Sequence, residues 1–198
     1  MENKNIKRFI LGTSNQHKLK EVNAIANLHN INFELVDKEF NPDENGSTFE
    51  ENAIIKATLA AKLTNTIAIA DDTGLCVEKL NGAPGIYSAR YAPTQEERIN
   101  KLLEELKGYD ESERQAHFTC AMAVVSPYGE VLFKTSTNIN GFITLYPKGK
   151  NGFGYDSVFF IPEENRTMAE LTDEQKNCIS HRGKALTNVI RYLQTNFC

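Results

Sequence analysis

Residues 6–18 of the chain read IKRFILGTSNQHK. The apolar run Ile6–Leu11 predicts a strand, Gly12–Asn15 predicts a tight turn, and the residues from Gln16 to about Leu28 predict a helix. A strand that leads through a polar turn into a helix is typical of phosphate sites in α/β proteins, because the helix N-terminus offers free N–H groups to an anion. This segment therefore predicts an α/β fold with an anion site near its N-terminus.

Two of the expected helices open with cations where acids are usual. Asn15 can act as the cap of the first helix, and Lys18 lies three positions further on. His181 and Arg182 follow Ser180 at the start of the last expected helix. The first turn of a helix already carries the positive end of the helix dipole, so it normally attracts Asp or Glu. Cations there are unfavourable unless a strongly anionic group is bound, and both places are therefore candidate phosphate sites.

An acidic pair, Asp71 and Asp72, ends the apolar strand that we expect at 66–70, and residues 75–77 are a candidate continuation of the sheet. Neighbouring side chains on an extended strand point to opposite faces, so only one of the two carboxylates faces a given pocket. Carboxylates at the carboxyl end of a strand in an α/β sheet are typical of Mg²⁺ sites. A solvated turn fits the pattern equally well. Glu44, in the acidic loop 37–46, is a weaker candidate of the same kind.

A long helix is expected to begin after Thr48 and to run to about Leu63, with Glu50 and Glu51 completing a capping box. It is apolar nearly all round and should be mostly buried. Lys56 lies on its apolar stripe, so this ammonium either needs a buried anion or snorkels from the edge of the core.

The glycine-rich segment 152–156, GFGYD, places two aromatic residues where the backbone can approach a ligand. These rings either stack on a flat base or point into the core. The remaining pattern predicts a strand at 33–36, a helix at 94–106, hairpin strands at 118–125 and 131–135, a third strand at 138–143, a strand at 157–161, a short helix after Thr172 and a last helix at 181–196.

The composition narrows the class of protein. The chain has 198 residues, a formal net charge of −4 and four cysteines without zinc-ligand spacing. The mild negative charge argues against a nucleic-acid partner, and no apolar run approaches the roughly 20 residues that cross a membrane. Since no secretory signal is visible, we expect a cytoplasmic protein. The sequence contains neither a P-loop nor a G-x-G-x-x-G fingerprint.

Along nearly its whole length the chain resembles the inosine triphosphate pyrophosphatase family, whose members hydrolyse non-standard purine nucleoside triphosphates such as ITP, dITP and XTP to the monophosphate and pyrophosphate. The resemblance rests on six segments that occur in order: TSNQHK (13–18), TFEENAIIKA (48–57), ADDTGL (70–75), GAPGIYSARY (82–91), GFGYD (152–156) and SHRGKAL (180–186). It implies a single domain over residues 1–198, with a long mixed β-sheet flanked by helices, two lobes with an active-site cleft between them, and a homodimer.

The resemblance also implies roles for individual residues. It assigns the phosphates to Thr13, Ser14, Asn15, Gln16, His17, Lys18 and Lys56. It assigns the base and sugar to Phe153, Gly154, Tyr155, Asp156, Lys176, His181 and Arg182. Asp72 is the implied proton acceptor and metal ligand, Glu44 the second metal carboxylate, and Thr73 a substrate contact. Two positions depart from the family pattern: Ser14 stands where glycine is common, and Thr73 where serine is usual.

These roles combine into a mechanism. Mg²⁺ on Asp72 and Glu44 would bridge the triphosphate while Lys18 and Lys56 neutralise it, and Asp72 would activate a water for attack on the α-phosphorus. Arg182 or a protonated His181 can only donate hydrogen bonds, which favours the 6-oxo group of hypoxanthine over the 6-amino group of adenine. Two alternatives remain open: a phosphatase acting on other phosphorylated metabolites, and a module that senses a nucleotide without cleaving it.

Overall fold

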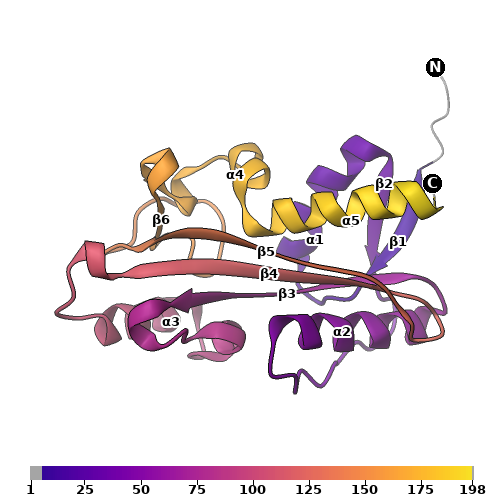
Figure 1. Ribbon diagram of the computed structural model, residues 1–198, viewed down its shortest axis with the longest axis horizontal. Coiled ribbons are helices and arrows are strands. Elements are labelled where there is room, and N and C mark those ends of the chain that lie inside the picture. Colours follow the sequence, from indigo (N-terminus) through magenta and orange to yellow (C-terminus); the bar gives the residue numbers. More distant parts are fainter. Residues whose placement is uncertain (1–5, 198) are drawn as a thin grey trace. The chain divides into compact units, whose positions relative to one another are not determined.

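The computed structural model describes residues 6–197, so that Cys198 lies outside the described residues. The strands are β1 (Lys7–Leu11), β2 (Ile31–Leu35), β3 (Ala68–Val77), β4 (Gln115–Val125), β5 (Val131–Ile143), β6 (Phe159–Ile161) and β7 (Arg166–Thr167). The α-helices are α1 (Gln16–Ala26), α2 (Phe49–Thr64), α3 (Gln95–Glu105), α4 (Asp173–Ile179) and α5 (His181–Phe197) (Figure 1).

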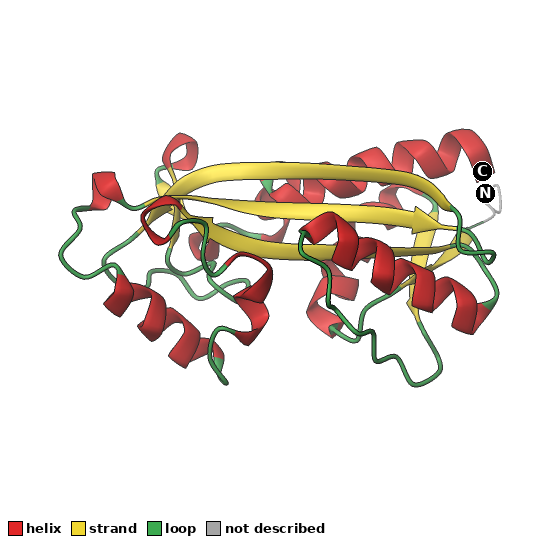
Figure 2. Ribbon diagram, turned by 60° about the horizontal axis from the view of Figure 1, so that its bottom comes forward, coloured by secondary structure: helices red, strands yellow, loops and turns green. Residues whose placement is uncertain are grey.

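The strands form a mixed sheet. Within the described residues its order is β2-β1-β3-β4-β5-β6-β7. β1 pairs in parallel with β2 and with β3, whereas β6 pairs antiparallel with β5 and with β7. Figure 2 shows the strands as yellow ribbons with helices in red around them. The predicted fold class, an α/β protein with a mixed sheet flanked by helices, is confirmed.

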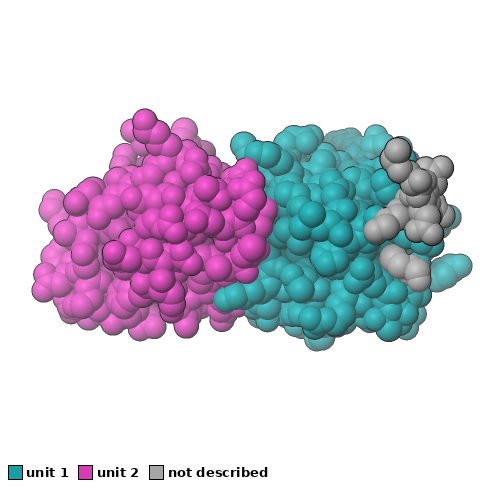
Figure 3. Space-filling model, turned by 90° about the horizontal axis from the view of Figure 1, so that it is seen from above, with its two compact units in different colours: residues 1–72, 120–137, 182–198 teal, residues 73–119, 138–181 magenta. Residues whose placement is uncertain are grey.

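The chain divides into two compact units, coloured separately in Figure 3. Unit 1 comprises residues 1–72, 120–137 and 182–198, and unit 2 comprises residues 73–119 and 138–181. The division passes through β3, β4 and β5, because each of these strands contributes residues to both units.

Unit 1 has a separate core on each face of its strands. In Figure 1, α1 and α5 lie on one side of β1 and β3, and α2 lies on the other. The core towards α1 and α5 contains large side chains such as Phe33, Ile69 and Leu186. The core beneath α2 is built almost entirely of alanines, which are Ala53, Ala57, Ala60, Ala61, Ala68, Ala70, Ala121 and Ala123, together with Val125. Small side chains on both surfaces allow α2 to approach the strands closely.

Unit 2 has its own apolar core, in which Leu75, Leu102, Phe159 and Met168 are fully buried. The amphipathic helix α3 contributes Leu102 to this core and begins with a complete capping box between Thr94 and Glu97. The helix predicted at 94–106 is therefore confirmed to within a residue at each end.

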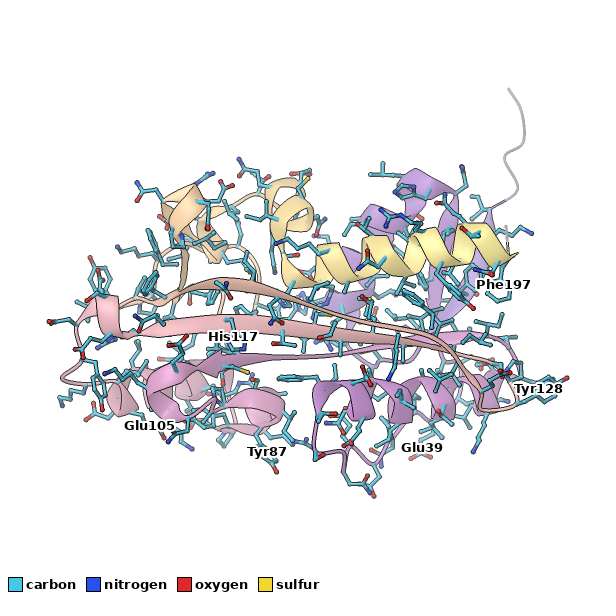
Figure 4. The ribbon with its side chains drawn as sticks, viewed as in Figure 1. Glu39, Tyr87, Glu105, His117, Tyr128 and Phe197 are labelled. Atoms are coloured by element: carbon cyan, nitrogen blue, oxygen red, sulfur yellow. The ribbon has the colours of Figure 1, made fainter. Side chains whose placement is uncertain are left out.

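The predicted hairpin is formed by β4 and β5. Its turn is closed by hydrogen bonds from the Gly129 N–H to the Ser126 carbonyl and from the Ser126 N–H to the Glu130 carbonyl. Tyr128 projects from this turn and is 95% exposed (Figure 4). The second and third predicted strands of this region are in fact one strand, β5, that runs from Val131 to Ile143.

The acidic pair does not end its strand. β3 continues from Ala68 through Asp71 and Asp72 to Val77, with almost every residue buried. Carboxylates usually stop a buried strand because burying an unpaired charge is costly, but here each carboxylate is paired with a cation. None of the helices described over residues 6–197 has the length and apolarity that a membrane crossing requires.

Candidate active site

The turn after β1 is organised by side-chain hydrogen bonds. The Asn15 side chain accepts from the N–H groups of His17 and Lys18 at 2.9 and 3.3 Å, which confirms Asn15 as the N-cap of α1. The Thr13 hydroxyl in turn accepts from the Asn15 N–H at 3.1 Å. Ser14, Gln16 and His17 are exposed. Asn15 therefore takes up N–H groups that were expected to face an anion: those of His17 and Lys18 donate to its side chain, and the Leu19 N–H donates to its carbonyl at 3.2 Å. The attraction for an anion that this turn keeps is that of the helix dipole.

Gly12 lets this turn lie against α2. A Cβ atom at Gly12 would lie 3.1 Å from both the Ala60 Cβ and the Lys56 carbonyl oxygen, and 3.2 Å from the Ala70 Cβ. Among the described non-glycine residues, a positive φ occurs only at four asparagines, so Ser14 needs no special backbone angle. The replacement of glycine by serine at this position is therefore conformationally neutral.

The Asp71 carboxylate contacts cations in the first turns of both α1 and α5. Its Oδ2 atom lies 2.9 Å from the Lys18 Nζ atom and 3.2 Å from the Arg182 Nη2 atom. Asp71 and Arg182 are buried, and the Lys18 side chain is only 16% exposed. The unfavourable position of Lys18 and Arg182 in the first turns of α1 and α5 is thus compensated within the protein by a carboxylate from β3.

The same partners keep Asp71 ionised. Burial favours the neutral carboxyl, but the Lys18 ammonium and the Arg182 guanidinium outweigh it and hold the pKa of Asp71 well below its usual range. Burial acts to lower the pKa of Arg182, and the carboxylates of Asp71 and Glu21 more than reverse this effect. Asp71 is therefore a fixed negative charge and a poor proton acceptor.

Asp72 faces the opposite side of β3, as the alternation of an extended strand predicts. Its Oδ1 atom lies 2.6 Å from the Lys56 Nζ atom on α2, and its Oδ2 atom accepts from the Asn52 side chain at 3.5 Å. Lys56 is 6% exposed and paired, so it does not snorkel from the edge of the core. Of the two interpretations of Lys56, the buried cation with an anionic partner is the one observed.

The protonation of Asp72 differs from that of its neighbour. Burial raises the pKa of Asp72, and the Lys56 ammonium offsets this only in part. For Lys56, burial acts to lower the pKa, but the carboxylates of Asp72, Asp71 and Glu44 outweigh it and the pKa is raised. Asp72 is therefore a carboxylate with increased affinity for a proton beside a permanently charged lysine, which suits a general base.

Glu44 reaches the same lysine from the acidic loop. Its Oε1 atom lies 3.4 Å from the Lys56 Nζ atom. Asn52 positions this loop, because its side-chain oxygen accepts from the Gly46 N–H at 2.9 Å while its amide contacts Asp72. Asn52 lies one turn before Lys56 on the same face of α2, and this spacing is the sequence signal that could have identified it.

The donor set around Lys56 fits a magnesium ion that also binds phosphate. Glu44 and Asp72 approach the same ammonium group, so their oxygens converge on one small region. Mg²⁺ is usually bound in proteins by one or two carboxylates together with waters and substrate phosphates. Over residues 6–197, no three His, Cys, Asp or Glu side chains form an all-protein metal cage.

In unit 2, the loop 152–156 is held by a buried ion pair. The Asp156 Oδ2 atom lies 2.7 Å from the Lys176 Nζ atom on α4 and accepts from the Phe153 N–H at 2.9 Å. The Lys176 ammonium also lies 4.8 Å from the centroid of the Phe153 ring. Gly152 is required here, because its φ is +73° and a Cβ atom would lie 2.1 Å from the Asp156 carboxylate.

The two aromatic residues of this loop differ in exposure. Tyr155 is 4% exposed, packs in the apolar core of unit 2 and donates its hydroxyl to the Ser88 carbonyl at 2.9 Å. Phe153 is half-buried, and the neighbouring Gly154 N–H donates to the Gln95 side chain at 2.9 Å. Tyr155 thus anchors the loop, and Phe153 is the ring that a flat ligand could reach.

His181 is also buried in unit 2. Its imidazole stacks on the Phe118 ring with a centroid separation of 4.8 Å and an interplanar angle of 7°. Thr73, the other predicted contact of this unit, is half-buried on β3. The structure therefore groups Lys18, Lys56, Asp72, Glu44 and Arg182 within unit 1, and Phe153, Asp156, Lys176 and His181 within unit 2.

Comparisons with known proteins agree on one family. A family model described as the Ham1 family matches residues 9–192. The dITP/XTP pyrophosphatase of Synechocystis sp. is 45% identical, covering 92% of this chain and 93% of that protein. The dITP/XTP pyrophosphatase of Bacillus subtilis is 43% identical, covering 96% of this chain and 98% of that protein. A solved structure of a HAM1 protein from Coxiella burnetii superposes with a TM-score of 0.84 at 41% identity, covering 96% of this chain and 99% of that one.

Proposed function

The chain belongs to the Ham1 family, and from this membership we propose that it hydrolyses ITP, dITP and XTP to the nucleoside monophosphate and pyrophosphate. The observation that carries the proposal is the Asp72 carboxylate, which is buried, held 2.6 Å from the Lys56 ammonium and flanked by Glu44. A proton acceptor beside a fixed cation and a second carboxylate is what metal-assisted attack of water on a phosphate requires.

In the proposed reaction, the triphosphate binds at the first turn of α1 and near Lys56. The positive end of the α1 helix dipole, with the ammonium groups of Lys18 and Lys56, balances the negative charge of the phosphates. Asp72 accepts a proton from the water that attacks the α-phosphorus, and pyrophosphate leaves. Asp71 stays ionised throughout, because its two cationic partners hold its pKa far below the physiological range.

We assign Mg²⁺ to the carboxylates of Glu44 and Asp72. When bound there, the ion would offset charge on the triphosphate as it develops during the reaction. The Lys56 ammonium compensates the negative charge of both carboxylates, since it lies within 3.4 Å of each.

Base selectivity rests on hydrogen-bond donors. Hypoxanthine and xanthine present an oxygen at the 6-position, whereas adenine presents an amino group. Arg182 and Lys176 carry charged donor groups that cannot accept a hydrogen bond, so an adenine amino group would leave such a donor without a partner. We propose that Arg182 donates to the 6-oxo group. Lys176, His181 and Phe153 are the further base contacts that the family resemblance implies, with Phe153 as the stacking ring.

The same family membership supports three further parts of the proposal. One family model spans residues 9–192, so we treat the chain as one catalytic domain despite its two compact units. We also propose that the protein acts in the cytoplasm, where nucleoside triphosphates are made and used. We propose further that it forms a homodimer. Size-exclusion chromatography with light scattering tests the homodimer directly.

The decisive experiment measures the products formed from ITP with Mg²⁺ and with excess EDTA. The expected result is pyrophosphate and IMP in equal amounts with Mg²⁺, and loss of turnover with EDTA. Inorganic phosphate in place of pyrophosphate would indicate a phosphatase, and binding without turnover would indicate a sensor. ATP cleavage at the same rate as ITP cleavage would refute the donor argument for base selectivity.

A further inference from the structure

Glu21 lies in the same network as the proposed substrate contacts but has no part in the reaction derived above. It lies on α1 one turn after Lys18, and its side chain is 17% exposed. Its Oε2 atom accepts from the Arg182 Nη1 atom at 2.6 Å, which is shorter than the contacts of 3.2 and 3.4 Å between the same guanidinium and Asp71. A nearly buried carboxylate at this distance from a nearly buried arginine is a strong orienting contact.

Asp71 holds the other side of the same guanidinium. Its Oδ2 atom accepts from the Arg182 Nε atom at 3.4 Å and from the Nη2 atom at 3.2 Å. Because these contacts use a single oxygen and are long, they allow the planar group to rock about that oxygen. The shorter contact from Glu21 to the third nitrogen removes this freedom, so the orientation of the guanidinium depends on both carboxylates.

The network also joins the two ends of the proposed substrate. Lys18 and Glu21 are three residues apart on α1 and therefore lie on the same side of that helix. Lys18 contacts Asp71 at 2.9 Å, and Asp71 contacts Arg182, so α1, β3 and α5 are linked by two cations and two anions within unit 1. The helix that opens on the phosphates thus also fixes the arginine assigned to the base.

We propose that Glu21 is a positioning residue that sets the orientation of Arg182 and thereby the selectivity for 6-oxo purines. The inference rests on the proposed function, since it assigns Arg182 to the base. Glu21 does not touch the substrate and acts only through Arg182. Its removal should weaken the binding of ITP while the activation of water by Asp72, on the opposite face of β3, continues.

The test compares Glu21→Ala and Glu21→Gln with the unaltered protein, using steady-state kinetics on ITP and ATP. For Glu21→Ala we expect KM for ITP to rise about tenfold or more with kcat within about twofold, so that the ratio of ITP to ATP cleavage falls by the same factor. Glu21→Gln keeps an acceptor oxygen but loses the charge, and should lower the ratio by roughly threefold.

Glu34→Gln is the matched control. Glu34 also contacts an arginine Nη1 atom, that of Arg8 at 3.2 Å, but the two side chains are 45% and 72% exposed. Its removal should leave KM and the ITP-to-ATP ratio unchanged. A purely structural role for Glu21 would lower the active fraction, and hence the apparent kcat for both nucleotides equally, without moving KM or the ratio.

A double-mutant cycle sharpens the test. In an Arg182→Ala background, Glu21→Ala should change the ITP-to-ATP ratio no further, because Glu21 acts through the arginine. An unchanged ratio in both Glu21 variants, or an equal drop with and without Arg182, would overturn the inference. Failure of the unaltered protein to release pyrophosphate from ITP would instead overturn the proposed function.

Discussion

The two faces of β3 carry adjacent aspartates that are used in opposite ways. On the face towards α1 and α5, Asp71 is paired with two cations and its pKa is held far below the ordinary value. On the face towards α2, Asp72 is paired with one lysine and its pKa is raised. Both carboxylates are buried, so the number of neighbouring cations decides which one becomes a fixed charge and which one can take up a proton.

Asp71 and Asp72 are neighbours in the chain, but the contacts of Asp71 suit a structural role and those of Asp72 suit a chemical one. Asp71 neutralises Lys18 and Arg182, the cations in the first turns of α1 and α5, which would otherwise repel each other and destabilise the fold. Asp72 keeps the proton affinity that a general base needs. The same substitution at the two positions should therefore produce different defects.

Replacement of Asp72 by asparagine should have the largest effect on turnover. The amide cannot accept a proton from water, so kcat for ITP should fall by roughly 100- to 10,000-fold. Lys56 keeps Glu44 as an anionic partner at 3.4 Å, so the protein should remain folded. Pyrophosphate release and thermal unfolding, measured on the same preparation, check both parts. Turnover within a factor of ten of the unaltered protein would remove Asp72 from the mechanism.

Replacement of Asp71 by asparagine should have the larger effect on stability. It removes the carboxylate that contacts the nearly buried ammonium of Lys18 and one of the carboxylates that contact Arg182, so the free energy of unfolding should fall by about 3 kcal/mol. Urea denaturation measures this loss, with Asp72→Asn as the matched control. Equal losses for the two variants would mean that the two faces of β3 do not differ as described.

The dependence of stability on pH should separate the two carboxyls further. In the unfolded chain Asp71 titrates near its ordinary value of 3.8, and in the folded protein it titrates well below that value. Its contribution is therefore fully present above about pH 3.8 and is lost as the pH falls towards the folded pKa.

Urea denaturation at several acidic pH values should show this loss as a convergence. The stability difference between the unaltered protein and Asp71→Asn should shrink as the pH falls below about 3.8. Asp72 has the opposite sign, because its raised pKa makes the folded state bind the proton more tightly. The unaltered protein should therefore gain stability relative to Asp72→Asn as the pH falls through the raised pKa of Asp72. A difference that stays constant down to strongly acidic pH would contradict the assignment of Asp71.

The smallest effect is expected at an exposed ion pair of unit 1. Glu50 contacts Lys134 at 2.6 Å, but the two side chains are 41% and 54% exposed. Glu50→Gln should change the free energy of unfolding by less than about 0.5 kcal/mol and leave the turnover of ITP unchanged. A loss close to that of Asp71→Asn would show that burial is not what distinguishes the pairs on β3.

Local sequence patterns predicted much of this arrangement. The Asn15 cap and the Thr48 cap are confirmed, because capping depends on residues only two or three positions apart. The opposite orientation of Asp71 and Asp72 follows from strand geometry alone. The predicted family and fold class are also confirmed, since six ordered segments specify them far better than any single motif.

The partners of the charged residues could not be predicted in the same way. Arg182 and Asp71 are 111 positions apart in the chain, and no local pattern indicates that α5 and β3 meet there. From the sequence, the cations at the helix openings therefore indicate a bound phosphate. In the structure, Asp71 contacts Lys18 and Glu21 contacts Arg182, so both cations already have a carboxylate partner within the protein. The end of β3 was predicted wrongly at Asp71 for the same reason, because the compensating cations lie far away in the chain.

The alanine-lined core beneath α2 makes the distance between Lys56 and Asp72 depend on the small size of the side chains between the helix and the sheet. Lys56 stands on this helix between Ala53, Ala57 and Ala60, and its distance to Asp72 is set by how far methyl groups allow α2 to sink towards β3. Added methyl groups in this layer would lift the helix and carry the ammonium away from the carboxylate, although neither charged residue had changed. The distance between Lys56 and the proposed general base Asp72 thus depends on the alanines of this layer, and larger residues there should slow the proposed reaction.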